Sequence, residues 1–249
     1  MFSFNSMDRK YQLLYTFGAI LTNPTSHQKL LDKRNGRSPW QQLAYDGKYL
    51  YSTTTLGGLY GHGLLFLLNT ANLKFKVLHD FISGSRGTGE GYLPQHVILV
   101  HSTTIIGVRP TDGRYDKGII YSICTKATDY RVLHSFGPAS KSDRVINSDG
   151  MYPLGIVRTQ RNHLVGITSW GGRYGGGTVV EINRDGTGFR VIDEERDKHD
   201  LNGVLPVHIW QVGSKIVVEN SAGGTHHEGT LLILTMNAGK FATESCLDF

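Results

Sequence analysis

Short apolar runs of four to six residues, separated by glycine, asparagine and aspartate, recur along the whole chain. This pattern is typical of short β-strands joined by tight turns. One run begins with an aromatic residue, and its clearest copies are residues 11–17 (YQLLYTF), 75–81 (FKVLHDF) and 130–136 (YRVLHSF). Weaker copies begin at Phe189 and Phe241. The last four starts lie 55, 59 and 52 residues apart, which indicates a repeat architecture.

A glycine-rich turn has the same irregular spacing. Its copies are GGLYGHG, DGRYDKG, GGRYGGG and GGTHHEG, at residues 57–63, 112–118, 171–177 and 223–229. Each copy ends in glycine and is followed by an apolar run, and the closing glycines are again 55, 59 and 52 residues apart. Because two independent markers share one irregular period, the chain consists of repeats of about 55 residues.

Each repeat contains the elements of a four-stranded antiparallel sheet. A Gly-x-x-Pro motif precedes the first strand, where a proline does not break a ladder hydrogen bond. Two short strands joined by a tight turn follow, then the glycine-rich turn, a third strand and the aromatic-led fourth strand. A sheet of this size matches a propeller blade, whereas two β-sandwiches would not need the same strand order in every unit. The sequence therefore predicts an all-β fold, a small β-propeller with four blades of four antiparallel strands.

The predicted propeller is one domain over residues 1–249. Its blades are residues 40–81, 94–136, 153–195 and 206–249, preceded by a strand at 11–17 and a loop at 18–39. We expect the strand at 11–17 to pair with blade 4 and close the ring. The last strand, near residues 241–247, would then be a fifth strand or compete for the same edge. A serine at the start, helix-forming residues and a final glycine predict a short helix within residues 26–36.

Several of these motifs share a consensus with a known bacterial family. The matching segments are residues 50–54 (LYSTT), 133–136 (LHSF), 149–153 (DGMYP), 164–168 (LVGIT), 171–172 (GG) and 177–180 (GTVV). With them the chain resembles the GloVer tandem repeats, and more distantly the propellers of streptogramin-type lyases. The resemblance implies a tandem-repeat β-propeller of bacterial type, and it assigns no catalytic residues.

Composition limits the remaining possibilities. With 39% hydrophobic and 19% charged residues, the chain is neither disordered nor membrane-spanning, and no apolar run approaches the ~18 residues of a spanning helix. The first residues lack the zones of a secretory signal, so we expect a cytoplasmic protein, a removed leader or an unrecognised export route. The two cysteines, Cys124 and Cys246, are expected to be buried reduced thiols.

Charge and motifs argue against several functional classes. The net charge is +5, but the charged residues are unevenly distributed: the first loop is basic and the last loop is acidic. Nucleic-acid binding requires a continuous basic stripe instead. The chain has no Walker loop, serine elbow, Cys-x-x-Cys pair or Rossmann fingerprint, so the sequence predicts no cofactor. We expect a protein, or a small anionic or glycan ligand, to bind the loop face.

The glycine-rich turns hold the candidate binding residues. One position is planar in all four copies, either to pack on the next blade or to stack on a sugar or base. Its members are Tyr60, Tyr115, Tyr174 and His226. Other variable or cationic positions nearby are His62, Arg109, Arg114, Lys117, Trp170, Arg173, His227 and Glu228. Surface solvation is the default explanation for such cationic groups, and the alternative is a phosphate or carboxylate site, which suits the bidentate fork of arginine.

Two histidines are the candidate catalytic residues. His96 and His208 occur at equivalent positions near the start of a first strand, and in a ring of four blades they would face the channel mouth from opposite sides. Imidazoles there could act as acid and base, but no carboxylate accompanies them at metal-ligand spacing, so no metal site is predicted. The sequence thus favours a non-catalytic module that binds a protein, glycan or nucleotide-like ligand. The alternative is a lyase or hydrolase that acts on an anionic substrate through His96 and His208.

Overall fold

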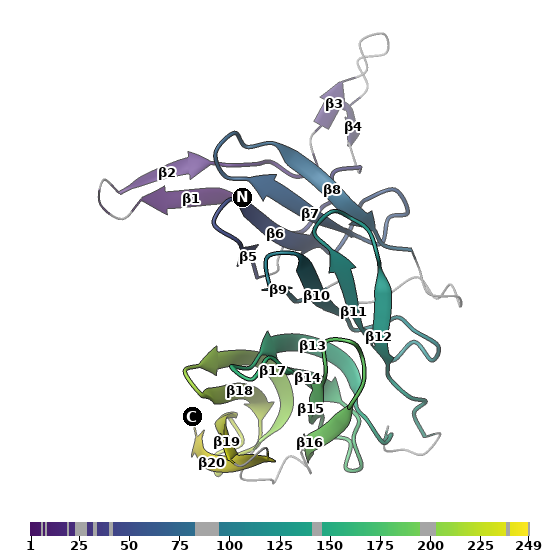
Figure 1. Cartoon of the computed structure of the whole chain (residues 1–249), viewed down its shortest axis with the longest axis vertical. Helices are drawn as coiled ribbons and strands as arrows, with labels where there is room; N and C mark the ends of the chain where they lie inside the picture. Colours follow the sequence, from purple (N-terminus) through teal and green to yellow (C-terminus); the bar gives the residue numbers. More distant parts are fainter. Residues whose placement is uncertain are drawn as a thin grey trace.

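The computed structural model describes residues 1–5, 7, 9–18, 20–22, 29–31, 34–39, 42–82, 95–140, 146–194, 203–237 and 240–248. Every regular element in these residues is a β-strand, and sixteen of them form four sheets of four antiparallel strands (Figure 1). The fold is therefore an all-β propeller with four blades. No helix long and apolar enough to cross a membrane occurs in the described part of the chain.

Each blade is a meander in which consecutive strands pair. Blade 1 comprises β5 (Ala44–Tyr45), β6 (Tyr49–Thr54), β7 (Leu64–Asn69) and β8 (Phe75–Asp80). Blade 2 comprises β9 (Val97–Val100), β10 (Thr104–Arg109), β11 (Ile119–Cys124) and β12 (Arg131–Ser135). Blade 3 comprises β13 (Met151–Arg158), β14 (Leu164–Trp170), β15 (Thr178–Ile182) and β16 (Arg190–Glu194). Blade 4 comprises β17 (Val204–Val212), β18 (Lys215–Ala222), β19 (Thr230–Asn237) and β20 (Lys240–Asp248).

Backbone geometry requires the glycine that closes each glycine-rich turn. Gly63, Gly118, Gly177 and Gly229 all have positive φ, between 83° and 113°. A Cβ at any of them would collide with a carbonyl oxygen of the preceding strand, that of Thr54 in β6, Arg109 in β10, Thr168 in β14 or Asn220 in β18. Only glycine permits both the backbone angle and this close approach, which explains why the residue recurs in all four repeats.

The hydrophobic core is divided among the junctions between neighbouring blades. One buried cluster joins blades 1 and 2 and includes Leu65 and Tyr121. A second joins blades 2 and 3 around Ile106 and Val180, and a third joins blades 3 and 4. No fourth cluster joins blade 4 to blade 1 among the described residues. Figure 1 accordingly shows the four sheets along an arc, with blades 1 and 4 at its two ends.

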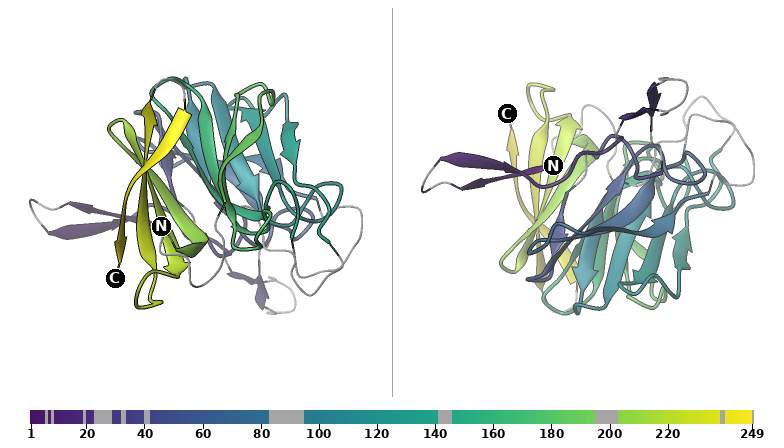
Figure 2. Two further views of the ribbon diagram at one scale, coloured as in Figure 1. Left: turned by 90° about the horizontal axis from the view of Figure 1, so that it is seen from below. Right: turned by 90° about the horizontal axis from the view of Figure 1, so that it is seen from above.

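The N-terminal strand does not close this arc, contrary to the expectation from the sequence. Its first part is β2 (Lys10–Leu13), which pairs with β1 (Phe2–Asn5) in a separate hairpin that projects from the blades (Figure 2). The fourth strand of blade 4 is instead the C-terminal β20, which pairs with β19 along almost its whole length. The edge that the N-terminal strand was expected to occupy is therefore already filled.

The second part of the predicted strand covers blade 1. The Tyr15 ring stacks on Phe75 with 4.3 Å between centroids, and the Phe17 ring lies 5.2 Å from Phe66. Phe66 has no solvent exposure, although it points away from the cluster that holds its neighbour Leu65. The N-terminal segment thus caps the face of blade 1 that has no neighbouring blade.

The loop before blade 1 differs from its prediction as well. β3 (Ile20–Thr22) pairs with β4 (Lys29–Leu31), so the middle of the expected helix is a strand. The remainder of that helix prediction lies partly outside the described residues. Of the two cysteines expected to be buried reduced thiols, Cys124 at the end of β11 is free but only partly buried, and the side chain of Cys246 lies outside the described part of the structure.

Candidate functional site

The glycine-rich turns expose one aromatic side chain from each of the first three blades. Tyr60, Tyr115 and Tyr174 are 50%, 39% and 37% exposed, and His226 is exposed at the equivalent position of blade 4. Each turn connects the second and third strands of its blade, so in a meander all four lie at the same end of the blades. We call the surface formed by these four turns the turn face.

The backbone holds each of these turns in the same way. The N–H of the closing glycine donates to the carbonyl oxygen of the residue six positions earlier. These distances are 2.9 Å for Gly63–Gly57, 3.0 Å for Gly118–Asp112, 3.1 Å for Gly177–Gly171 and 3.2 Å for Gly229–Gly223. A second backbone bond inside the turn occurs in blades 1, 2 and 4, for example from Gly61 N to Gly58 O at 3.3 Å. The turns are therefore closed loops with defined geometry.

A side chain from the end of the fourth strand also ties each turn of blades 1 to 3 to its blade. The Asp80 carboxylate accepts the N–H of Leu59 at 2.7 Å, Ser135 Oγ accepts that of Arg114 at 3.0 Å, and Glu194 accepts that of Arg173 at 3.4 Å. The residue so anchored immediately precedes the exposed tyrosine. Sequence reasoning missed these anchors because their identities differ, although their position one residue before the end of the aromatic-led segment is constant.

The charged residues of the turns have mixed surroundings. The Arg114 guanidinium lies 5.3 Å from the Tyr115 ring centroid, and Arg173, which is 76% exposed, lies 3.9 Å from Glu194. Lys117 is partly buried and donates to the Tyr152 hydroxyl of blade 3 at 3.4 Å. The remaining candidates comprise Trp170, His227 and Glu228, which are exposed, and His62, which is partly buried. The turn face thus combines planar groups with charges of both signs.

Arg109 does not belong to a cationic rim, contrary to the expectation from the sequence. Its side chain is only 4% exposed and pairs with Asp112, three residues later. It also donates to the Ile82 carbonyl oxygen at 3.3 Å and lies 4.8 Å from the Phe81 ring centroid. Arg109 is therefore a buried structural cation beside the junction of blades 1 and 2.

The two candidate catalytic histidines have unlike environments. His96 is buried, and its Nδ1 accepts the N–H of Ile156 at 2.9 Å while its Nε2 contacts the Gln42 side-chain oxygen. The pKa of His96 is lowered to about 4, chiefly because burial disfavours the charged ring and to a smaller extent because of the nearby His208. His208 itself is 65% exposed and lies 3.0 Å from Glu219. With both ring nitrogens of His96 engaged, the two imidazoles do not form a free acid–base pair.

No group of three or more histidine, cysteine, aspartate or glutamate side chains could hold a metal ion in the ranges that the structure describes.

Sequence reasoning overlooked a cavity at the end of blades 3 and 4 opposite the turn face. Most of its residues belong to the turns between first and second strands or to the adjoining strand ends, which carry no conspicuous motif, and Phe241 begins a weaker copy of the aromatic-led run.

Solved structures share the fold with little sequence similarity. TolB from Acinetobacter baumannii is 11% identical, with a TM-score of 0.52 over 88% of this chain and 46% of that protein. A gluconolactonase from Xanthomonas campestris is 10% identical, with a TM-score of 0.55 over 90% of this chain and 66% of the enzyme. A putative 6-phosphogluconolactonase from Bacteroides uniformis is 10% identical, with a TM-score of 0.54 over 98% of this chain and 62% of that protein. The chain thus spans less than two thirds of each.

A comparison of the sequence with curated proteins found no match. A family model, the Gloeobacter/Verrucomicrobia repeat, matches residues 19–194, which include blades 1 to 3. This match covers more than half of the chain and confirms the resemblance read from the repeat motifs. The chain therefore belongs to the Gloeobacter/Verrucomicrobia repeat family.

Proposed function

We propose that this protein is a non-catalytic recognition module that binds a glycan across the turn face. The observation that carries the proposal is the exposure of Tyr60, Tyr115 and Tyr174 on turns closed by the same backbone hydrogen bond. If these rings served only to pack between blades, they would be buried like Tyr51 and Tyr121. An exposed ring on a backbone-closed turn instead presents a flat apolar surface with a polar edge, which suits the face of a sugar.

The distribution of the rings over three blades favours an extended ligand over a single small molecule. Each tyrosine belongs to a different blade, so one glycan chain could contact several rings in succession. Contacts that are individually weak then combine, because binding at one site raises the effective concentration at the next. Rigid turns help, since little conformational entropy is lost when the ligand binds.

The other ligand classes have less support. Nucleic acid would require a continuous basic surface, whereas Arg173 here lies near Glu194 and Glu228 is exposed at the same face. The enzyme alternative relied on His96 as an acid or base, and the hydrogen bonds at both of its nitrogens argue against that role. The gluconolactonase named above shares 10% identity with this chain, which supports a common fold and no transfer of activity.

Affinity electrophoresis in gels containing soluble polysaccharides tests the proposal. The probes are xylan, mixed-linkage β-glucan, dextran and pectin, and the variant is the triple substitution Tyr60→Ala, Tyr115→Ala and Tyr174→Ala. We expect at least one polysaccharide to retard the wild-type protein and the triple variant to migrate as in a gel without polysaccharide.

The matched control is Tyr45→Ala. Tyr45 is 55% exposed but lies in β5, next to the turn between β5 and β6 at the opposite end of blade 1. Retardation should be unchanged in this variant, and thermal unfolding should show that all variants remain folded. The proposal is wrong if none of the four polysaccharides retards the wild type, or if the triple variant is retarded equally.

A further inference from the structure

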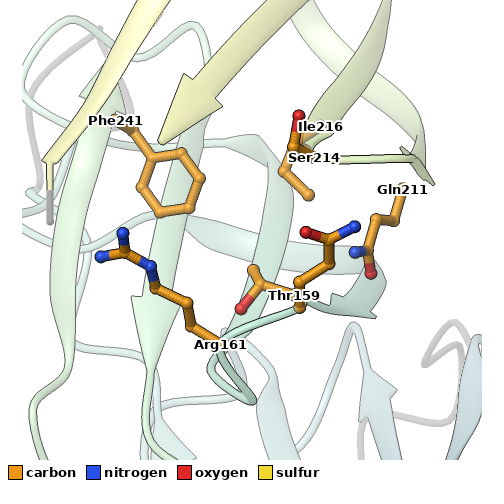
Figure 3. Close-up of a pocket in the computed structure, with 7 residues that line it drawn as sticks. Thr159, Arg161, Gln211, Ser214, Ile216 and Phe241 are labelled. Atoms are coloured by element: carbon orange, nitrogen blue, oxygen red, sulfur yellow. The ribbon is translucent and has the colours of Figure 1, made fainter. Parts of the chain in front are cut away.

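A cavity of about 160 Å³ lies between blades 3 and 4 at the end opposite the turn face (Figure 3). It is formed by the turn between β13 and β14, the turn between β17 and β18, and the start of β20. Its lining residues are Thr159, Gln160, Arg161, Gln211, Ser214, Ile216 and Phe241. Nothing in the proposed glycan site involves these residues.

The lining has one positive charge and no negative charge. Arg161 is exposed, and its guanidinium makes no ion pair or hydrogen bond with any described residue. The turn that carries it is well defined, because Asn162 N donates to Thr159 O at 2.9 Å and His163 N donates to Thr159 Oγ1 at 3.2 Å. An unneutralised guanidinium carried by a well-defined turn at the wall of a cavity attracts an anion.

The other side chains supply hydrogen-bonding groups and an apolar wall. Gln211 uses its amide nitrogen to donate to Gly213 O at 3.2 Å, which leaves its amide oxygen free to accept from a ligand. Gln160 and Ser214 make no hydrogen bond through their side chains to described residues. In Figure 3 the Phe241 ring lies on the same side as Arg161, while Gln211, Ser214 and Ile216 lie across from them.

We infer that this cavity binds a small carboxylate that carries hydroxyl groups. The Arg161 fork matches the two oxygens of a carboxylate, and the amides and the Ser214 hydroxyl match hydroxyl groups on the same molecule. Phe241 and Ile216 provide the surface against which its carbon skeleton packs. The cavity is smaller than the ~300–1,000 Å³ typical of sites for drug-sized ligands, so the ligand is the size of a single sugar acid.

Protein-observed NMR titration separates the parts of this inference. The probes are glucuronate, which has the carboxylate and the hydroxyls, glucose, which has only hydroxyls, and acetate, which has only the carboxylate. At constant ionic strength and pH 7, glucuronate should shift resonances of residues around the cavity, with a dissociation constant at least tenfold lower than those of glucose and acetate.

Two variants assign the effect to the guanidinium. Arg161→Gln should raise the dissociation constant for glucuronate at least tenfold, while Arg158→Gln, which removes an exposed arginine of β13 outside the cavity lining, should leave it unchanged. The inference is overturned if glucuronate produces no shifts at the cavity, if acetate or glucose binds as tightly, or if Arg161→Gln has no effect. The triple tyrosine variant should still bind glucuronate, so failure of the glycan proposal is distinguished from failure here.

Discussion

The N–H of Ile156 in blade 3 donates a hydrogen bond of 2.9 Å to Nδ1 of His96 in blade 2. Because Nδ1 accepts this bond, the proton of the neutral ring must lie on Nε2, which faces the Gln42 side-chain oxygen. A single imidazole therefore connects three blades, and it does so only in its neutral form. His96 thus links neighbouring blades, and each of its ring nitrogens has a partner within the fold.

The pH dependence of the free energy of unfolding should reveal the lowered pKa of His96. Its pKa is about 4 in the folded protein and near 6.5 when unfolded, so between these values the unfolded chain binds more protons. The stability that the neutral ring contributes is therefore present above pH 6.5 and is lost as the pH falls toward 4. From pH 7 to pH 5 this group should lower the free energy of unfolding by about 2 kcal/mol. Urea unfolding at both pH values measures the loss, and a His96→Gln variant should lack this component; an equal loss in both proteins would contradict the assignment.

The N-terminal cap should stabilise blade 1. Phe17→Ala removes the ring that covers Phe66 and should lower the free energy of unfolding by about 2 kcal/mol, because apolar surface of both residues becomes exposed. Leu13→Ala in the projecting hairpin is the control, since Leu13 is 67% exposed and its loss should change stability by about 0.5 kcal/mol or less. Similar effects of the two substitutions in urea unfolding would show that the segment does not act as a cap.

Two glycines of one turn allow the destabilisation caused by backbone strain to be measured separately from that caused by a steric collision. Gly61 and Gly63 have φ of 84° and 83°, but a Cβ at Gly61 would meet open space, whereas one at Gly63 would collide with the Thr54 carbonyl oxygen. Gly61→Ala should cost about 1 kcal/mol of stability, from the positive φ alone. Gly63→Ala should cost about 3 kcal/mol or more, because the third strand must shift away from the second. Equal melting temperatures of the two variants would contradict the collision.

The Arg109–Asp112 pair should be required for the junction of blades 1 and 2. Asp112→Asn leaves the guanidinium buried without its counter-charge, which should destabilise the protein by about 3 kcal/mol. Replacing both residues, as Arg109→Met with Asp112→Asn, removes the unpaired charge and should recover part of that loss in thermal unfolding. A double variant less stable than Asp112→Asn would instead assign Arg109 a stabilising role through Phe81 and the Ile82 carbonyl.

The repeating parts of this protein can be read from its amino-acid sequence. Strand order within a blade, the number of blades and the glycines that close the turns all follow from local rules that act within about 55 residues, so each repeat shows them independently. The tyrosine position of the turns was also visible, because a shared position in several copies stands out against variable neighbours.

How the repeats and the chain ends meet depends on contacts between residues that are distant in the sequence. Residues 11–17 have the same pattern as a fourth strand, but β20 occupies the edge of blade 4, and the rings of Tyr15 and Phe17 instead cover Phe66 and Phe75. Whether His96 and Arg109 are free or engaged depends on Ile156 and Ile82, which are 60 and 27 residues away in the chain. The cavity of Arg161 likewise forms where turns of two blades meet. Contacts of this kind leave no local pattern, because burial and charge pairing depend on three-dimensional neighbours rather than on periodicity.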